Sequence, residues 1–308
     1  MPQADVHPTP RARQARAFLL PYDSARREER MGRGPAHLLR HGAVSALRAG
    51  GLDVDAEMVE ADDPFSTEVA TTFALYRRLA ERVRVAAGEA RTPLVLSGNC
   101  GAALGAVAGL RAAATGGARD AGAIADTLGV VWFDAHGDFN TPDTTASGFL
   151  DGMMLAALTG RCWRGMTARL PGFEPLPPAD VVLVGARDLD DAERLALDAS
   201  EVTLVPPARV RELGVVGALA PALDALAGRT RAVYLHVDVD VLDAAVAKGN
   251  ALASAGGLAP AELVAAVRLI RDRCGVAGVG VASYDPEYDE RGEVYRAAVA
   301  ALEAAVGG

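Results

Sequence analysis

The sequence contains few cysteines and a single lysine. Its three cysteines, Cys100, Cys162 and Cys274, are too few and too scattered for a disulfide framework, and no CxxC pair is present. A structural zinc site is therefore not expected. A reducing cytoplasm fits this cysteine usage best. All basic residues except Lys248 and the histidines are arginine, which we attribute to genome composition and not to chemistry.

Long hydrophobic runs and an excess of positive charge are also missing. No apolar run reaches the length of a membrane span, and no signal-peptide core follows Met1, so we expect no contact with a membrane. The formal net charge of −9 argues against a general nucleic-acid surface. The arginine-rich segment 11–40 is interrupted by acidic residues and is interpreted as a solvated face. With 308 residues, of which 50% are hydrophobic and 23% charged, the chain is long enough to bury a sizeable core.

Apolar segments typical of strands alternate with helical segments along the chain. The expected strands are 16–23, 92–99, 128–136, 180–188, 202–210, 231–240 and 276–286, and the expected helices are 34–50, 102–114, 261–274 and 293–306. This alternation predicts an α/β fold with a mainly parallel sheet covered by helices on both faces. No linker interrupts the pattern, so we expect one three-layer α/β/α domain over residues 16–308. Residues 1–15, rich in Pro and Arg, are predicted to form a flexible tail.

The segment VVWFDAHGDFN, residues 130–140, ends an apolar run with three potential metal ligands. Asp134, His136 and Asp138 stand at alternate positions, and residues two apart in an extended chain project to the same side. We therefore expect the three side chains to converge just beyond the strand. Two carboxylates that close repel each other unless a cation or a proton lies between them.

Polar side chains follow four further expected strands. They are Asn99 and Cys100, Asp188 and Asp190, the group Asp238, Asp240 and Asp243, and the segment Ser283 to Glu287. In an open parallel sheet, sites form outside the carboxyl ends of the strands. Any one of these clusters is open to interpretation as a helix cap or turn, and for Asp188 and Asp243 that interpretation is at least as good as a functional one.

Clusters after five strands favour a cationic centre. The oxygens of Asp134, Asp138, Asp238 and Asp240, with the imidazole of His136, suit Mn²⁺ or Mg²⁺ better than zinc. Four carboxylates are many for one ion and natural for two. A pair of ions would lower the pKa of a water molecule and so supply a nucleophile at neutral pH.

The sequence resembles the ureohydrolases, the superfamily of arginases and agmatinases. DAHGD (134–138) matches the family's Asp-Ala-His-x-Asp motif, and DVDVLD (238–243) its second Asp-x-Asp motif, with Ala244 in place of the usual Pro. LVLSGNC stands where the family has a Gly-Gly-Asp-His strand end, and PYDSARREERMGRGPAHLL resembles its opening strand, turn and helix. The likeness runs over about residues 17–305. It implies two Mn²⁺ ions per chain and a homo-oligomer, a trimer or hexamer.

The resemblance also implies roles for individual residues. Asp138 and Asp240 match the ligands that bridge the two ions, Asp134, His136 and Asp238 complete the ligand set, and Cys100 is a possible sixth ligand. Within the superfamily, NTPDTTASG (140–148) resembles arginases and not agmatinases. The residues matching Asn140 and Ser147 there contact the substrate's α-carboxylate, and the one matching Asp190 lies near its α-amino group. The implied substrate is a small guanidino amino acid, although Asn140 to Pro142 is also good turn chemistry.

Three departures from the family lie around the reacting group. Cys100 replaces the first His ligand and is either a thiolate ligand or a buried spectator. In having a Cys at this position, the sequence resembles the hydroxyarginine amidinohydrolases of antibiotic pathways. Asp151 replaces the His usually assigned to proton transfer, and would need a raised pKa to act as a catalytic residue beside His136. Ser283 replaces the glutamate that anchors the guanidinium group, for which Asp285 or Glu287 are alternatives.

Three functions were weighed on this basis. The favoured one is a binuclear manganese amidinohydrolase that converts a guanidino or N-hydroxyguanidino amino acid to a urea and an amine. The alternative is a catalytically degenerate family member that binds metal or acts as a regulator. A nucleotide-binding oxidoreductase is discarded, because the glycines of GNCGAALGAVAG do not follow G-x-G-x-x-G.

Overall fold

An eight-stranded sheet forms the centre of the computed structural model, which describes residues 13–62, 65–115 and 127–307. Every neighbouring pair of strands in it is parallel, which confirms the predicted sheet. In spatial order the strands are β4 (Asp53–Met58), β1 (Gln14–Leu20), β5 (Thr92–Ser97), β10 (Val276–Ala282), β9 (Ala232–Asp238), β6 (Leu128–Phe133), β7 (Val181–Val184) and β8 (Thr203–Val205). Two short strands, β2 (Tyr22–Asp23) and β3 (Arg26–Arg27), pair separately and antiparallel.

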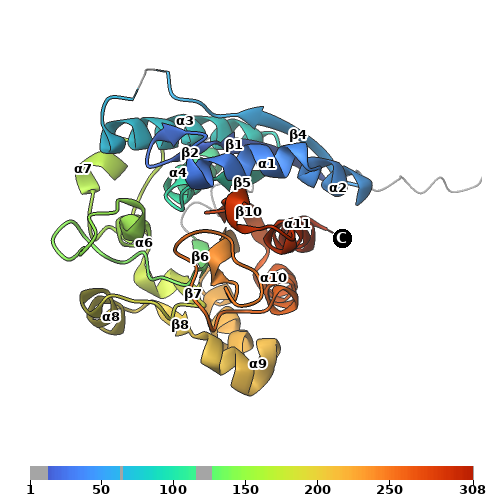
Figure 1. Ribbon diagram of the computed structural model, residues 1–308. Coiled ribbons are helices and arrows are strands. Elements are labelled where there is room, and N and C mark those ends of the chain that lie inside the picture. Colours follow the sequence, from blue (N-terminus) through green and yellow to red (C-terminus); the bar gives the residue numbers. More distant parts are fainter. Residues whose placement is uncertain (1–12, 63–64, 116–126, 308) are drawn as a thin grey trace, which may run out of the picture.

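Helices cover both faces of the sheet and complete the three layers (Figure 1). One face packs against α1 (Gly34–Arg40), α2 (Ala43–Ala49), α9 (Pro207–Ala227), α10 (Pro260–Cys274) and α11 (Glu293–Val306). The other packs mainly against α3 (Glu68–Gly88), α4 (Ala102–Thr115), α6 (Met154–Leu158) and α8 (Asp191–Asp198). A further short helix, α7, spans Arg164–Thr167. The predicted α/β class and layer order are confirmed.

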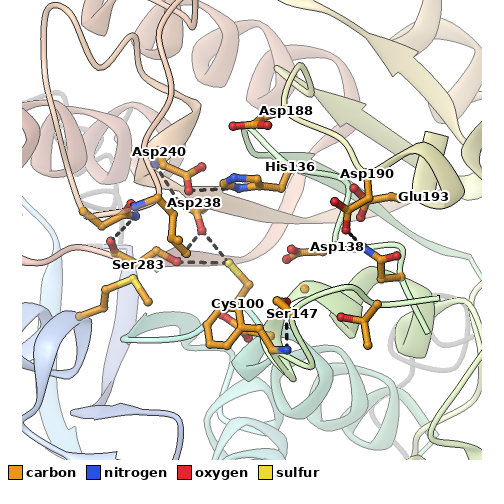
Figure 2. A pocket seen from close by; sticks show the side chains of 18 residues that line it. Cys100, His136, Asp138, Ser147, Asp188, Asp190, Glu193, Asp238, Asp240 and Ser283 are labelled. Atoms are coloured by element: carbon orange, nitrogen blue, oxygen red, sulfur yellow. Dashed lines mark hydrogen bonds and ion pairs between the residues drawn. The ribbon is translucent and has the colours of Figure 1, made fainter. Parts of the chain in front are cut away.

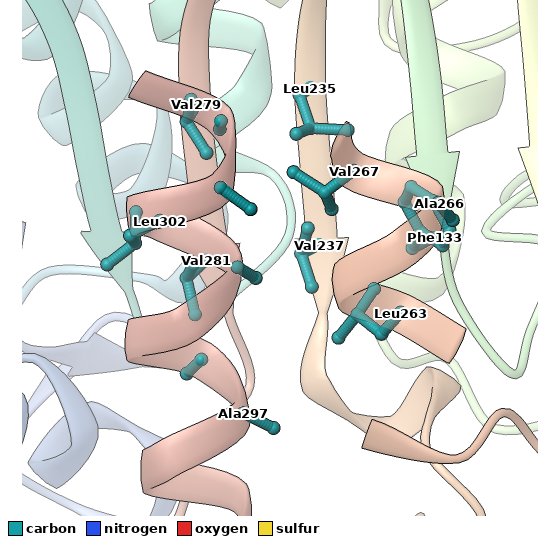
Figure 3. Packing of buried hydrophobic residues seen from close by; sticks show 14 of the residues in the cluster. Phe133, Leu235, Val237, Leu263, Ala266, Val267, Val279, Val281, Ala297 and Leu302 are labelled. Carbon is teal, nitrogen blue, oxygen red and sulfur yellow. The ribbon is translucent and has the colours of Figure 1, made fainter. Parts of the chain in front are cut away.

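The period of two along each strand divides its side chains between two hydrophobic clusters. In β9, Leu235 and Val237 belong to one cluster and Tyr234 to the other. Figure 3 shows Leu235 and Val237 facing Leu263 and Val267 of α10. Because both faces are covered, the central strands are continuous apolar runs. Each such buried side chain contributes about 1.5–3 kcal/mol relative to an exposed one.

Element boundaries differ from the expected ones at several places, and the expected strand 202–210 ends at Val205, before α9 begins at Pro207. The expected helix 34–50 is two helices, divided at Gly42, whose φ of 95° breaks the helical path. Strand β4, the long helices α3 and α9 and the shorter helices α6, α7 and α8 were not predicted. Residues 1–12 of the expected tail lie outside the described residues, and Gln14 and Ala15 already belong to β1, so the folded domain begins before the expected boundary at residue 16. In the part of the chain that the structure describes, no helix is long and apolar enough to cross a membrane.

Candidate active site

A cavity of about 270 Å³ opens beyond the carboxyl ends of β5, β6, β9 and β10 (Figure 2). Ten of the candidate residues line it: Cys100, His136, Asp138, Asn140, Ser147, Asp151, Asp190, Asp238, Asp240 and Ser283. Asp134 does not line the cavity and is almost fully buried, at 1% exposed. The structure therefore gathers residues from five chain segments at the predicted edge of the sheet.

Two carboxylates, those of Asp134 and Asp240, fix the loop after β6 through hydrogen bonds. Asp134 accepts hydrogen bonds from the Trp132 indole at 3.0 Å and from the His136 backbone N–H at 2.8 Å. The Ala135 N–H donates to Asp240 Oδ1 at 3.1 Å, which ties this loop to the end of β9. The chain does not stay extended as expected, since Asp138 has a left-handed φ of 49°.

Two groups of three side chains are arranged so that they could each hold a metal ion. Cys100, Asp134 and Asp238 form one group, and Asp134, His136 and Asp240 form the other, with ligand atoms within 4.8 Å of one another in each. Asp134 is common to both. Asp138 belongs to neither group at that distance, but its Oδ2 is buried and has no hydrogen-bond partner. A buried carboxylate oxygen without a partner is costly, so it fits a position beside a cation.

The electrostatics of these groups also call for positive charge. Burial, followed by neighbouring carboxylates, raises the pKa values of Asp138 and Asp238 well above the ordinary range. Burial opposes the charge on His136 and Asp240, but their side-chain contacts prevail. Contacts with Asp134 and Asp240 raise the pKa of His136 to about 12, and the contact with His136 lowers the pKa of Asp240 to about 2. One imidazolium cannot neutralise four buried carboxylates, and divalent ions among them would.

Cys100, which follows β5, lies against the end of β9. Its Sγ donates to Asp238 Oδ2 at 2.9 Å and lies 3.4 Å from Ser283 Oγ. Ser283 Oγ donates to the same oxygen of Asp238. Burial and then the charge of Asp238 raise the pKa of the Cys100 thiol well above its usual value. Without a cation the group is therefore a thiol, and both hydroxyl and thiol are directed at one carboxylate.

Asp151 is part of the cavity wall and caps the start of α4. Its two oxygens accept the backbone N–H groups of Cys100 at 2.8 Å and Gly101 at 2.9 Å. Burial raises its pKa to about 7, although these two N–H groups oppose the rise. The raised pKa that a proton-transfer role requires is thus present, in a residue that also has a structural function.

Asp285 and Glu287 do not take the place of the missing glutamate. Both accept hydrogen bonds from Arg33 Nη2, Asp285 at 2.9 and 3.1 Å and Glu287 at 2.6 Å. Neither lines the active-site cavity, so the expectation that one of them compensates for Ser283 is not supported. The backbone oxygen of Ser283 accepts from Asn250 Nδ2 at 2.9 Å, which holds this residue at its left-handed φ of 65°.

The residues expected at the amino-acid end all line the cavity, and Asp190 lies on the side opposite Ser283. Figure 2 shows Asp190 and Glu193 on one side and Ser283 on the other, with Asp138 between them. Asn140 Nδ2 donates to Asp190 Oδ2 at 2.9 Å. Ser147 Oγ accepts from the Phe149 N–H at 3.1 Å.

Glu193 and Asn250 are buried polar lining residues that were not predicted. Glu193 is 4% exposed and accepts the Phe139 N–H at 2.8 Å, which fixes the loop that carries Asp138 and Asn140. Burial raises its pKa. In the sequence it is indistinguishable from an ordinary acidic residue in the first turn of a helix. Asn250 lies in a loop far from any strand end, and its sequence position carries no signal that we can identify.

Comparisons with known proteins point to one family. The model of the arginase family matches residues 15–307. The chain is 29% identical to the arginase of Bacillus subtilis (strain 168) over 259 residues, 84% of this chain and 83% of that one. It is 32% identical to the arginase of Bacillus caldovelox over 226 residues, 73% of this chain and 72% of that one. The crystal structure of arginase from Bacillus subtilis matches with a TM-score of 0.84 at 27% identity, covering 96% of this chain and 99% of that one.

Proposed function

Because this chain belongs to the arginase family of ureohydrolases, we propose that it is a binuclear manganese amidinohydrolase that converts a guanidino amino acid to a urea and an amine. The observation that carries the proposal is the buried cluster of carboxylates at the strand ends, with Asp138 Oδ2 unpartnered among them. The residues that would hold the ions are Cys100, Asp134, His136, Asp138, Asp238 and Asp240. Two ions bound there would activate water as a nucleophile and offset the charge of the cluster.

The other lining residues have roles that follow from their positions. Asn140, Ser147 and Asp190 would bind the amino-acid end of the substrate and so direct its guanidino carbon toward the carboxylate cluster. Asp151, in the cavity wall on the side of Cys100, would protonate the leaving amine. His136, at 28% side-chain exposure, is more accessible than Asp134 and lines the cavity, so it would contact the reacting group.

The finer proposal is that the guanidino group is an N-hydroxyguanidine. A buried guanidinium without a facing carboxylate costs several kcal/mol. Ser283 stands where the family has that carboxylate, and Arg33 holds both Asp285 and Glu287 away from the cavity. An N-hydroxyguanidine is a weaker base and largely neutral near pH 7, so it needs no such partner. Its hydroxyl would hydrogen-bond to Ser283.

A substrate screen with the Mn²⁺-loaded protein tests both levels of the proposal. Urea or hydroxyurea release is measured with arginine, N-hydroxyarginine and agmatine, and the metal content of the same preparation is determined. We expect N-hydroxyarginine to exceed arginine in kcat/KM and agmatine to be poor, because it lacks the carboxylate. Release from arginine alone would refute the N-hydroxyguanidine, and no release from any guanidine with two ions bound would refute the enzyme.

A second function is favoured by one specific observation. The Cys100 thiol and the Ser283 hydroxyl both donate to Asp238 Oδ2, so this carboxylate is satisfied without an ion. A catalytically degenerate protein that binds metal or ligand as a regulator would have such a site. Less than one metal per chain after Mn²⁺ loading, together with the absence of turnover, would exclude the binuclear hydrolase and leave a regulator that binds a ligand without metal.

Two properties of the whole protein belong to the proposal. Its three cysteines are buried and unpaired, which supports a reducing, cytoplasmic location. The family resemblance supports a homo-oligomer, a trimer or a hexamer, which light scattering of the purified protein would test.

A further inference from the structure

Arg187 lies in the loop after β7, where its partly buried guanidinium binds the protein backbone. Its Nε, Nη1 and Nη2 atoms donate at 2.8–3.3 Å to six backbone carbonyl oxygens, those of Gly185, Asp240, Val241, Leu242, Ser254 and Ala255. A guanidinium has five N–H donors in a fixed plane, so these acceptors can satisfy every one of them. The proposed reaction gives this residue no role.

The contacts of Arg187 join the loops that carry the candidate metal ligands. Residues 240–242 form the turn after β9, and residues 254–255 lie in the loop that leads to α10. The backbone N–H of Arg187 donates to Ala135 O at 2.8 Å, in the loop after β6. The ends of β6, β7 and β9 are therefore tied together at one residue.

The carboxylate of Asp240 depends on this junction for its position. Its Oδ1 accepts from the Ala135 N–H at 3.1 Å, and its Oδ2 lies 3.3 Å from His136 Nδ1 (Figure 2). Arg187 holds both sides of this contact, since its side chain binds Asp240 O at 3.0 Å and its N–H binds Ala135 O. Removal of the guanidinium therefore releases the backbone that carries Asp240.

The two candidate metal groups differ in what holds their carboxylates. They are the cysteine group of Cys100, Asp134 and Asp238 and the histidine group of Asp134, His136 and Asp240. In the cysteine group, the Cys100 thiol and the Ser283 hydroxyl both donate to Asp238. In the histidine group, Asp240 is held by the loop after β6. A change at Arg187 should therefore reach the two groups unequally.

The charge of Arg187 acts against a metal ion, so any benefit to the ion comes from position. An arginine stays protonated in proteins. Its fixed positive charge repels a divalent cation bound to a neighbouring carboxylate. Removal of the charge alone would tighten the binding of the ion, whereas loss of the positioning would weaken it. The two effects differ in sign.

We propose that Arg187 is a positioning residue that holds Asp240 in place for the metal ion of the histidine group. This rests on the proposed function, which places an ion there. Protein groups that orient metal ligands typically change metal affinity by about 10–100-fold when they are removed. The ion of the cysteine group is affected less, because Asp238 has its own side-chain donors.

Manganese binding by two variants tests the proposal. Arg187→Met keeps an unbranched side chain without charge or N–H donors, and Arg187→Lys keeps the charge but loses the planar fork. In calorimetric titration with Mn²⁺, both should bind one ion about 10–100-fold more weakly and retain the other. At equal Mn²⁺ concentration, the EPR spectrum should change from that of an exchange-coupled pair to that of an isolated ion.

Arg211→Met is the matched control. Arg211 Nη1 donates to Gly256 O at 3.0 Å, beside the carbonyls of residues 254–255 that Arg187 binds. This variant loosens the same loop and leaves the described hydrogen bonds of Asp240 intact, so it should bind both ions as the wild type does.

Hydrogen exchange of the metal-free protein in EDTA provides a second readout. The Ala135 N–H donates to Asp240 Oδ1, so its exchange reports whether this carboxylate is in place. It should be faster in both Arg187 variants and unchanged in Arg211→Met. If Arg187→Met does not fold, Arg187→Lys, which retains a charged donor, carries the test.

The remaining outcomes overturn the positioning role or separate it from the proposed function. Wild-type affinity for both ions in Arg187→Lys, equal weakening of both ions, or failure of both variants to fold overturns the role. Tighter binding in Arg187→Met shows that only the charge acts, and also overturns it. If the wild type binds no Mn²⁺, the proposed function fails, and the exchange of the Ala135 N–H decides the positioning: faster exchange supports it and unchanged exchange overturns it. Urea release with both ions bound in every variant leaves the proposed function standing and overturns the positioning.

Discussion

Replacing Asp151 by Asn should make the metal-free protein progressively more stable than the wild type as the pH rises. Burial raises the pKa of Asp151 to about 7 from an ordinary 3.8. The folded protein therefore retains a proton that the unfolded chain releases, and the free energy of unfolding falls between about pH 4 and pH 7. The difference between these pKa values corresponds to a loss of about 4 kcal/mol above pH 7, of which about 2 kcal/mol is already lost at pH 5.

Asn carries no charge and escapes this loss, but it accepts hydrogen bonds through one oxygen only. One of the two N–H groups that Asp151 binds, those of Cys100 and Gly101, would lose its acceptor. A buried N–H without a partner costs about 1–3 kcal/mol at every pH. We therefore expect near-equal stability at pH 5 and a variant more stable by about 2 kcal/mol at pH 8.

Thermal unfolding in EDTA between pH 5 and pH 8 measures this. For a chain of 308 residues the expected gain at pH 8 is a Tm higher by about 3 °C, from an unfolding entropy of about 2.1 cal/mol/K per residue. Asp198→Asn, an exposed change at the end of α8, is the control for the loss of a carboxylate. A Tm difference between Asp151→Asn and wild type that stays constant across this pH range would refute the reasoning.

Three further outcomes test the proposed centre. Asp138→Asn or Asp240→Asn should lose at least one of two bound Mn²⁺ ions and nearly all activity, and elemental analysis that finds both ions retained would contradict the ligand assignment. Cys100→Ser should weaken one ion and leave the other nearly intact, whereas Cys100→His should restore tight binding; equal Mn²⁺ affinities in wild type and both variants would make Cys100 a spectator. Ser283→Glu should shift the ratio of kcat/KM for N-hydroxyarginine over arginine by at least tenfold toward arginine, since it returns a carboxylate to the guanidinium, and an unchanged ratio in a steady-state assay would count against the role given to Ser283.

The apolar interior strands were predictable because both of their faces are buried. In β6, all six residues from Leu128 to Phe133 are buried, so the run stands out in the sequence. Strand β4 at the sheet edge has the sequence DVDAEM, with Val54 as its one buried residue, and carries no such signal. The layered fold can be predicted from the alternation of strands and helices. The edge strand β4 can be recognised only from its pairing with β1 in the structure.

The site was predictable where its residues directly follow a strand. Asp134 and Asp238 lie at the ends of β6 and β9, and local sequence places them at the sheet edge. Whether Asp285 is available to bind a guanidinium depends instead on its ion pair with Arg33, which lies 252 positions away in the chain. Chemically reasonable substitutes for a lost carboxylate can be named from sequence, but whether they are free to act is decided by such distant partners.

The strand order has a consequence for how the protein is made. β10 is the last strand in the chain, yet it lies at the middle of the sheet between β5 and β9. Until it emerges from the ribosome, the β4-β1-β5 part and the β9-β6-β7-β8 part have no strand to join them, and Cys100 and Asp238 are held by different pieces. Pairings this distant in sequence form slowly. An ion held by the group of Cys100, Asp134 and Asp238 would therefore be bound only when synthesis is almost complete, whereas the group of Asp134, His136 and Asp240 lies within one part. In a nascent or truncated chain that ends before residue 276, the first group would be divided.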